Sequence, residues 1–139
     1  MRAIDTLAKM RSSAAADSIA RLLDDPEPWV RIAAAHALGE IGAAGASAYL
    51  VSTLEDSIYS VVNAGLVGLG RLRAVETYEK IVALTTSDNK HVRKHAAIAL
   101  GEIGDPRAIT TVRQLAEHDA DSGVRFMAAK ALGKLENNR

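Results

Sequence analysis

One short phrase of sequence recurs four times along this chain. The copies are VRIAAAHALGEIG (30–42), VVNAGLVGLGRLR (61–73), VRKHAAIALGEIG (92–104) and VRFMAAKALGKLE (124–136). Matching leucines, one of them ahead of the first copy, lie 31, 31, 31 and 32 residues apart: Leu7, Leu38, Leu69, Leu100 and Leu132. A fixed period of this size is typical of supersecondary units that stack on one another. The chain is therefore expected to form an array of repeated units rather than one closed core.

Each repeat carries two apolar stripes with helical spacing. In the first repeat the stripe of the second segment is made by Val30, Ala34, Ala37, Leu38 and Ile41. A shorter stripe precedes it in each repeat, made by Ile19, Leu22 and Leu23, by Leu50 and Leu54, by Ile81 and Leu84, and by Val112 and Leu115. We therefore predict an all-α protein, an α-solenoid of stacked antiparallel helical hairpins of about 31 residues each.

The repeat positions also predict where the elements begin and end. The expected elements are a lone opening helix at 1–11 and hairpins at 12–42, 43–73, 74–104 and 105–136, nine helices in a single domain of residues 1–139. The Asp-Pro pairs at 25–26 and 105–106 predict helix starts, because aspartate caps a helix and proline suits its first position. Gly42 and Gly104 are expected in the left-handed conformation that follows a helix end.

Small residues occupy the positions where neighbouring second helices would meet. The glycines of one column are Gly39, Gly70, Gly101 and Gly133. A glycine there would let the next helix approach closely, at a cost of about 1 kcal/mol in helix propensity relative to alanine. In the second repeat Gly65 and Gly68 also replace alanines. They predict a helix weaker by about 2 kcal/mol in intrinsic propensity, unless closer packing offsets the loss.

The recurring residues resemble a known family of helical repeats. The Val-Arg pair, the alanine block and the L-G-x-I-G ending match the D-P-x-x-V-R-x-x-A-A-x-A-L-G-x-I-G pattern of HEAT-like repeats of the phycobilisome-lyase type over nearly the whole chain. The resemblance implies that the repeated arginine forms a ladder with aspartates of the turns between helices, rather than a binding row. The arginines are Arg31, Arg93 and Arg125, and the nearby aspartates are Asp25, Asp88 and Asp121. Val62 replaces the arginine in the second repeat and interrupts the ladder.

The composition excludes several classes of protein. The 139 residues contain no cysteine, which excludes disulfides and thiolate chemistry and agrees with a cytoplasmic location, the one we expect. No apolar run approaches the roughly 20 residues that cross a bilayer, so no membrane partner is expected. Residues 1–70 hold 5 basic and 8 acidic residues, and residues 71–139 hold 12 and 9. This asymmetry is too small for a broad basic field, so we expect no nucleic-acid partner.

Function is expected at positions of the second helices outside the core stripe. Several of these positions are apolar: Trp29, Ile32, Val67, Ile98 and Phe126. An apolar patch with a charged rim is typical of a protein-binding site, and Trp is enriched among interface hot spots. We predict a partner-binding surface on the concave face, made by Trp29, Ile32, His36, Asn63, Val67, Arg71, His91, Lys94, Ile98, Phe126 and Lys130. The alternative is that Trp29 folds back onto its own hairpin and Phe126 packs against a neighbour.

Candidate catalytic groups are sparse. His91 and His95 are four residues apart and could hold a transition metal, but a third ligand is missing, so two solvated histidines are the preferred interpretation. The metal-dependent deoxyhypusine hydroxylases have a similar repeat but use His-Glu dipeptides. The four histidines of this chain are followed by Ala37, Val92, Ala96 and Asp119. We therefore expect no metal, no cofactor and no enzymatic activity.

These observations favour a non-catalytic scaffold or adaptor that binds a polypeptide partner. The alternative implied by the resemblance is a phycobilin-lyase-like subunit that handles a tetrapyrrole chromophore. Weak self-association through the chain ends is also expected, because a terminal repeat exposes the surface that another repeat would cover. The apolar residues at these ends are Ile4, Leu7 and Met10, and Leu132 and Leu135.

Overall fold

The structure is a computed structural model that describes residues 2–137, with side chains described for Met10 and residues 12–137. Within this range the chain is all-helical, which confirms the predicted fold class. The eight α-helices are α1 (Arg2–Ala20), α2 (Pro28–Ile41), α3 (Ala46–Leu50), α4 (Tyr59–Arg71), α5 (Tyr78–Leu84), α6 (Lys90–Ile103), α7 (Ile109–His118) and α8 (Ser122–Asn137). Four short 3-10 helices join them: η1 (Arg21–Asp24), η2 (Val51–Glu55), η3 (Val75–Thr77) and η4 (Pro106–Ala108). None of the described helices is long and apolar enough to span a bilayer.

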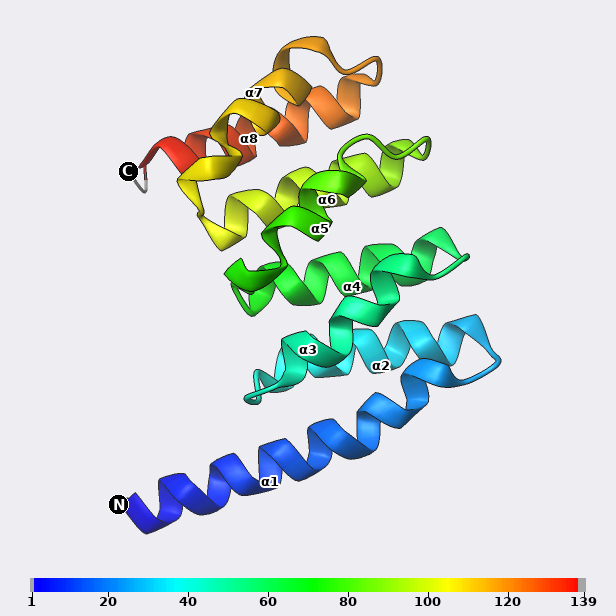
Figure 1. Cartoon of the computed structure of the whole chain (residues 1–139), viewed down its shortest axis with the longest axis vertical. Coiled ribbons are helices and arrows are strands. Elements are labelled where there is room, and N and C mark those ends of the chain that lie inside the picture. The colour runs from blue at the N-terminus through cyan, green and yellow to red at the C-terminus, as the bar shows by residue number, and fades with distance from the viewer. Residues whose placement is uncertain (1, 138–139) are drawn as a thin grey trace. The chain divides into compact units, whose positions relative to one another are not determined.

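The helices group into two compact units, Met1–Gly68 and Leu69–Arg139, with the boundary inside α4. In the first unit α1 and η1 pair with α2, and α3 and η2 follow (Figure 1). In the second unit α5 packs on α6, while α6 and α7 both pack on α8 (Figure 1). Each unit is thus built from helical hairpins. The division of a single domain into the repeats expected above stays a prediction.

The first helix differs from the expectation. Instead of a lone helix over 1–11 and a new helix after it, α1 runs without interruption to Ala20 and continues as η1 to Asp24. The expected break at residues 11–16, RSSAAA, contains neither glycine nor proline, and three alanines favour helix. The described residues therefore form eight α-helices where nine were predicted.

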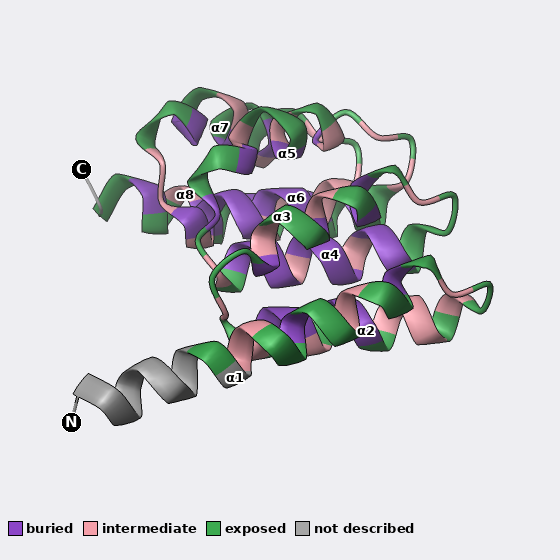
Figure 2. Cartoon of the chain, turned by 60° about the horizontal axis from the view of Figure 1, so that its bottom comes forward, coloured by how far each residue is buried: buried purple, intermediate pink, exposed green. Residues whose placement is uncertain are grey.

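The second helices of the repeats supply most of the core, and Leu50, Ile81 and Val112 of the first helices are also fully buried. In Figure 2 the buried residues gather on α4 and α6. Leu38 and Leu66 of the first unit and Leu100 of the second are fully buried. The stripe predicted for α2 is less covered than expected, since Val30, Ala37 and Ile41 are only half-buried. The buried face of α2 is made by Ala34, Ala35, Leu38 and Gly39.

The glycine column works as predicted, by admitting a neighbouring helix. A Cβ added at Gly39 would lie 2.7 Å from the Cα of Gly68 in the first unit. In the second unit a Cβ at Gly70 would lie 3.2 Å from the Cα of Ala99, and one at Gly101 would lie 2.9 Å from the Cα of Ala131. Gly133 is the exception, because a Cβ there would meet nothing within 4 Å.

The additional glycines of α4 are also explained by close packing. A Cβ at Gly65 would lie 1.7 Å from the Oγ1 of Thr53, and one at Gly68 would lie 2.7 Å from the Cδ1 of Leu50. The close packing named above as the exception to a weaker helix is therefore present at both glycines.

Helix ends follow the predicted signals in part. Gly42 and Gly104 adopt left-handed conformations with φ of 64° and 78°, as predicted. Asp105 accepts a hydrogen bond from the N–H of Arg107 at the start of η4, also as predicted. The prediction that a helix starts at Pro26 is wrong, because α2 begins at Pro28.

The expected apolar residues at the chain ends are only partly accessible. Met10 is exposed, but Leu132 is half-buried and Leu135 is fully buried on the inner face of α8. The side chains of Ile4 and Leu7 lie outside the described residues. Leu135 therefore cannot contribute to a contact at this end.

Candidate functional site

The arginine column forms a structural ladder, but with other aspartates than predicted. Arg31 donates from Nε and Nη2 to the carboxylate of Asp56, at 2.8 and 3.1 Å. Arg93 donates in the same way to Asp119, at 2.9 and 3.1 Å. In each case the aspartate belongs to the turn of the next repeat, 25 or 26 residues along the chain. These side chains are mostly buried, so the ladder interpretation is confirmed and its predicted partners are corrected.

The predicted partners Asp25, Asp88 and Asp121 have other roles. Asp25 and Asp88 accept from Nη1 of Arg31 and Arg93 through their backbone carbonyls, at 2.8 and 3.3 Å. Asp121 uses its carboxylate to accept from the N–H of Val124 at the start of α8. Arg31 and Arg93 therefore each join the turn of their own repeat, through carbonyl oxygens, to the turn of the next repeat, through a carboxylate.

The arginines change the acidity of the two ladder aspartates. Burial raises the pKa of Asp56, but hydrogen bonds from Arg31 and the N–H of Ile58, with the charge of Arg31, outweigh burial and place this pKa below its ordinary value. At Asp119 burial likewise raises the pKa, while hydrogen bonds from Arg93 and the N–H of Asp121 outweigh it. The pKa of Asp119 is therefore also lowered, and both carboxylates are held in the charged form.

The predicted partner-binding residues all lie at least partly at the surface. In the first unit Trp29 and His36 are exposed, and Ile32, Asn63 and Val67 are half-buried. In the second unit the exposed members are Arg71, His91, Phe126 and Lys130, and the half-buried members are Lys94 and Ile98.

The two aromatic rings proposed for this surface are accessible. Trp29 is 69% exposed and Phe126 is 63% exposed. The ammonium of Lys130 lies 5.7 Å from the centre of the Phe126 ring. Neither ring is buried, as the alternative of Trp29 folding back onto its own hairpin and Phe126 packing against a neighbour would require. The binding role itself stays a prediction.

A basic groove lies in the second unit, where the ends of α4, α6 and α8 meet. It consists of two adjoining hollows of about 510 and 160 Å³ that share Glu102 and Lys134. The larger hollow is also lined by Gly70, Arg71, Arg73, Gly101 and Asn137. The smaller hollow is also lined by Ile98, Met127, Lys130 and Ala131. Of the predicted binding residues, Arg71, Ile98 and Lys130 line this basic groove.

Six side chains of the basic groove were not among the predicted binding residues: Arg73, Glu102, Met127, Ala131, Lys134 and Asn137. Lys134 and Glu102 follow Lys130 and Ile98 by four residues, so helical spacing places them on the same faces as these predicted residues. Met127 was not distinguished from core residues. Arg73 stands in the column of Gly42 and Gly104 and takes the same left-handed conformation, with φ of 51°. An arginine in a glycine position after a helix was the signal available for it.

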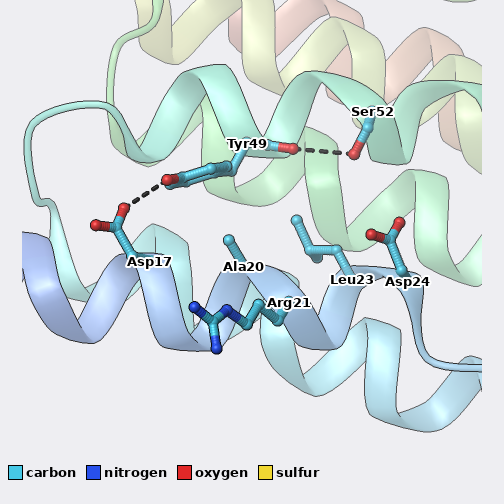
Figure 3. A pocket seen from close by; sticks show the side chains of 7 residues that line it. All are labelled: Asp17, Ala20, Arg21, Leu23, Asp24, Tyr49 and Ser52. Atoms are coloured by element: carbon cyan, nitrogen blue, oxygen red, sulfur yellow. Dashed lines mark hydrogen bonds between the residues drawn. The ribbon is translucent and has the colours of Figure 1, made fainter.

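A separate hollow of about 560 Å³ lies in the first unit. It is bounded by α1 and η1 on one side and by α3 and η2 on the other. Figure 3 shows its lining: Asp17, Ala20, Arg21, Leu23, Asp24, Tyr49 and Ser52. The hydroxyl of Tyr49 donates to the carboxylate of Asp17, and this bond is the main cause that raises the pKa of Tyr49. No predicted site residue lines this hollow, whose charged residues are two aspartates and one arginine.

One histidine of the pair considered as a metal site, His95, bonds to the backbone of its own helix. The Nδ1 of His95 lies 2.8 Å from the carbonyl oxygen of His91, which makes it the donor of a hydrogen bond within α6. In the part of the chain that the structure describes, no three His, Cys, Asp or Glu side chains gather where they could hold a metal ion.

Comparison with known proteins supports the repeat assignment. A family model described as HEAT repeats matches residues 1–70 and 78–139. No curated protein sequence matches the chain. A solved structure of human deoxyhypusine hydroxylase in complex with glycerol is similar, with a TM-score of 0.77 and 25% identity over 94% of this chain and 46% of that chain. An engineered protein is similar with a TM-score of 0.67 and 24% identity, over 87% of this chain and 62% of that one.

The complex of CpcE and CpcF of phycocyanin lyase from Nostoc sp. is also similar, with a TM-score of 0.64 and 18% identity over 88% of this chain and 65% of that chain. The chain thus spans about half the length of the hydroxylase and less than two thirds of the other two. The resemblance to HEAT-like repeats is confirmed.

The comparisons correct the expectation that the chain is not an enzyme. Deoxyhypusine hydroxylase and phycocyanin lyase are enzymes, and both have structures similar to this chain. One fold carries many activities, so the scarcity of recognisable catalytic motifs was an insufficient reason to exclude catalysis.

Proposed function

Because the chain belongs to the HEAT-repeat family, we propose that it is a repeat scaffold that binds a polypeptide partner and receives an acidic segment of that partner in the basic groove. The basic groove itself carries the proposal. Arg71, Arg73, Lys130 and Lys134 surround it, and Glu102 is the one acidic side chain of its lining. Charges arranged in this way attract carboxylates and orient a bound chain.

The floor of the basic groove suits an apolar side chain of the same partner. Ile98 and Met127 line the smaller hollow, and the unbranched methionine adapts its shape to what it contacts. Gly70 and Gly101 line the larger hollow, where they bring no side chain into the space. A segment that alternates acidic and apolar residues matches both features.

The backbone of Arg73 gives further support. A residue other than glycine in the left-handed region costs of order 1–3 kcal/mol, and such residues cluster at binding and active sites. Arg73 adopts this strained backbone conformation at the rim of the basic groove. Its counterparts in other repeats, Gly42 and Gly104, adopt the same conformation without strain because they have no side chain. The exposed ring of Phe126 extends the proposed recognition surface beyond the basic groove in the second unit, and Trp29 presents an exposed ring in the first unit.

Peptide binding tests the proposal. A fluorescently labelled peptide of alternating glutamate and leucine is expected to bind more tightly than a matched peptide of lysine and leucine, and its binding should weaken as salt rises. The double variant Lys130→Glu with Lys134→Glu should bind the glutamate peptide about tenfold less tightly, equivalent to about 1.4 kcal/mol.

Lys80→Glu is the matched control. It adds the same kind of charge change on α5, outside the basic groove, and should leave the affinity unchanged. Equal binding of the two peptides, or an equal loss in the control variant, would show that the basic groove is not the binding site. The chromophore-handling alternative is supported only by a similarity at 18% identity, which concerns the fold alone, so it stays a prediction.

A further inference from the structure

Two neighbouring turns form one edge of the first unit. The turn before α2 and the turn before α4 lie on the same side of this unit (Figure 1). Arg31 donates to the backbone carbonyls of Asp25 and Pro26 in the first turn, at 2.8 and 3.1 Å. It also donates to the carboxylate of Asp56 in the second turn, at 2.8 Å. One side chain therefore holds the two turns together, and the residues that flank them share one surface.

This edge exposes three apolar side chains, those of Trp29, Ile58 and Tyr59. The residues at the matching positions of the second unit are polar or small: Asn89, Lys90, His91, Asp121, Ser122 and Gly123. The repeat pattern therefore does not require apolar residues at these positions, and their aromatic character is particular to the first unit.

Exposure at these positions is a property of the repeat. The position of Trp29 is exposed in all of the later repeats, as Ser60, His91 and Gly123. The position of Tyr59 is exposed again at the starts of α6 and α8. Stacking of one repeat on the next therefore leaves these positions uncovered, and the two rings are accessible to a partner.

Three carboxylates belong to the same two turns. Asp24, Glu27 and Glu55 are exposed, and among the described residues none of them has an ion-pair partner. The one basic residue within 24–31 and 55–60 is Arg31, which is paired with Asp56. The edge therefore combines exposed rings with negative charge that the chain itself does not neutralise.

Helix stability does not account for these carboxylates. Asp24 and Glu55 are the last residues of η1 and η2, where the helix dipole disfavours a negative charge. Glu27 directly precedes α2, but its side chain makes no capping hydrogen bond. In the second unit, the positions of Tyr59 and Ile58 carry a paired charge instead, with Lys90 3.7 Å from Asp121.

We call Asp24, Glu27, Trp29, Glu55, Ile58 and Tyr59 the acidic edge. We propose that the acidic edge binds an arginine-containing segment of a protein partner. Its unpaired negative charge selects a basic occupant. Arginine fits better than lysine, because the planar guanidinium stacks on an aromatic ring and bonds to a carboxylate through two parallel N–H groups. The proposal concerns a different unit and the opposite charge from the basic groove, so it does not rest on the function proposed for that groove.

Peptide binding to the intact chain tests the proposal. A fluorescently labelled peptide of alternating arginine and leucine should bind, and salt should weaken the binding. The matched peptide of lysine and leucine should bind less tightly. Trp29 is the single tryptophan of the chain, so its emission should change when the unlabelled arginine peptide is added.

Charge reversal locates the site. The double variant Glu27→Lys with Glu55→Lys should lower the affinity for the arginine peptide at least about tenfold, because like charges then face each other. Glu79→Lys with Glu117→Lys is the matched control. It makes the same change at two exposed glutamates of the second unit, and should lower the affinity by less than about twofold.

Substitution of the ring separates stacking from charge. Trp29→Ala should lower the affinity about tenfold, whereas Trp29→Phe keeps an aromatic face and should retain most of it. Both variants should keep the helix content of the parent protein in circular dichroism, because Trp29 is exposed.

Several outcomes would overturn the proposal. They are equal binding of the arginine and lysine peptides, an equal loss of affinity in the control pair, and a Trp29 emission that does not respond. Self-association that is lost both in Glu27→Lys with Glu55→Lys and in Lys130→Glu with Lys134→Glu would show that a second copy occupies the acidic edge instead. Sedimentation velocity at low salt measures this.

Discussion

The guanidinium of Arg93 holds the carboxylate of Asp119 with Nε 2.9 Å from Oδ2 and Nη2 3.1 Å from Oδ1. The two side chains are 17% and 5% exposed. A second ion pair of the same unit, Arg113 with Glu136, has 3.4 Å between its atoms and side chains 45% and 44% exposed. Both pairs join an arginine to a carboxylate, but only one is buried. Comparing them therefore shows how much burial changes the contribution of such a pair to stability.

Removing the buried arginine should destabilise the fold. Arg93→Met is expected to lower the free energy of unfolding by about 1–3 kcal/mol, between the values for exposed and for buried pairs, because Asp119 is left without its donor. Arg113→Met should change it by less than about 1 kcal/mol. Urea unfolding followed by circular dichroism measures both. Equal losses in the two variants would contradict a special role of the ladder.

The lowered pKa values of Asp56 and Asp119 predict a loss of stability in acid. A carboxyl whose pKa is lower in the folded state stabilises the fold fully above its unfolded value, about 3.9, and loses this contribution as pH falls through the folded value. The urea midpoint should therefore fall as the pH drops below about 4. Asp119→Asn should be less stable near neutrality and lose less on acidification. An unchanged acid slope in this variant would show that other carboxyls dominate.

The fit of Gly65 against Thr53 predicts opposite effects of one substitution at two glycines. Gly65→Ala should destabilise by about 1–3 kcal/mol, because the new methyl displaces the Thr53 hydroxyl from its hydrogen bond to the carbonyl of Leu50. Gly133→Ala should stabilise by up to about 1 kcal/mol, since it gains helix propensity without a clash. Thermal unfolding would reveal the difference, and a gain at both positions would show that α4 has room for the methyl.

The exposure of Trp29 can be measured directly, because it is the single tryptophan of the chain. Its fluorescence should be quenched efficiently by iodide, and Trp29→Ala should change the free energy of unfolding by no more than about 0.5 kcal/mol. Leu38→Ala, at a fully buried site, should cost about 2–5 kcal/mol. A blue-shifted, poorly quenched emission would place the ring within its hairpin. If Trp29 is an interface hot spot, its truncation should weaken partner binding by roughly 1–4 kcal/mol.

The hydrogen bond between Tyr49 and Asp17 predicts a tyrosine that ionises late. The pKa of Tyr49 is raised because its hydroxyl donates a hydrogen bond to the carboxylate of Asp17. In an absorbance titration, Asp17→Asn should move one tyrosine transition to lower pH. Identical curves for the variant and the parent protein would show that the bond is not formed in solution.

The repeat period was sufficient to predict the helices after α1 and the glycine contacts of Gly39, Gly70 and Gly101, because both depend on local spacing. The period was insufficient to predict which aspartates pair with the ladder arginines. Aspartates close to each arginine in the sequence were predicted, but the carboxylates come from the turn of the next repeat. The matching column could have been found, since Asp25, Asp56 and Asp119 recur with the repeat. Where Val62 replaces the arginine in the second repeat, Ser87 replaces the aspartate that would be its partner, so both members of this ion pair are absent together.

The basic groove was harder to predict because it depends on how three helices meet. Arg71, Ile98 and Lys130 were identified from the helix face, whereas Arg73 needed the left-handed turn that follows α4. Whether α1 would break near residue 11 also depended on context, because the sequence there has no terminator. Local rules therefore predicted elements more reliably than the hollows between them.

The ladder has a consequence for how such a chain can change in length. Arg31 and Asp56 are 25 residues apart, and Arg93 and Asp119 are 26 apart, yet the paired atoms lie at nearly the same distances. The additional residue is absorbed in the segment between the two partners, which includes the first helix of the hairpin. Only the turn that carries the aspartate is held in register, so single-residue insertions and deletions upstream of it can accumulate during evolution without disturbing the stack.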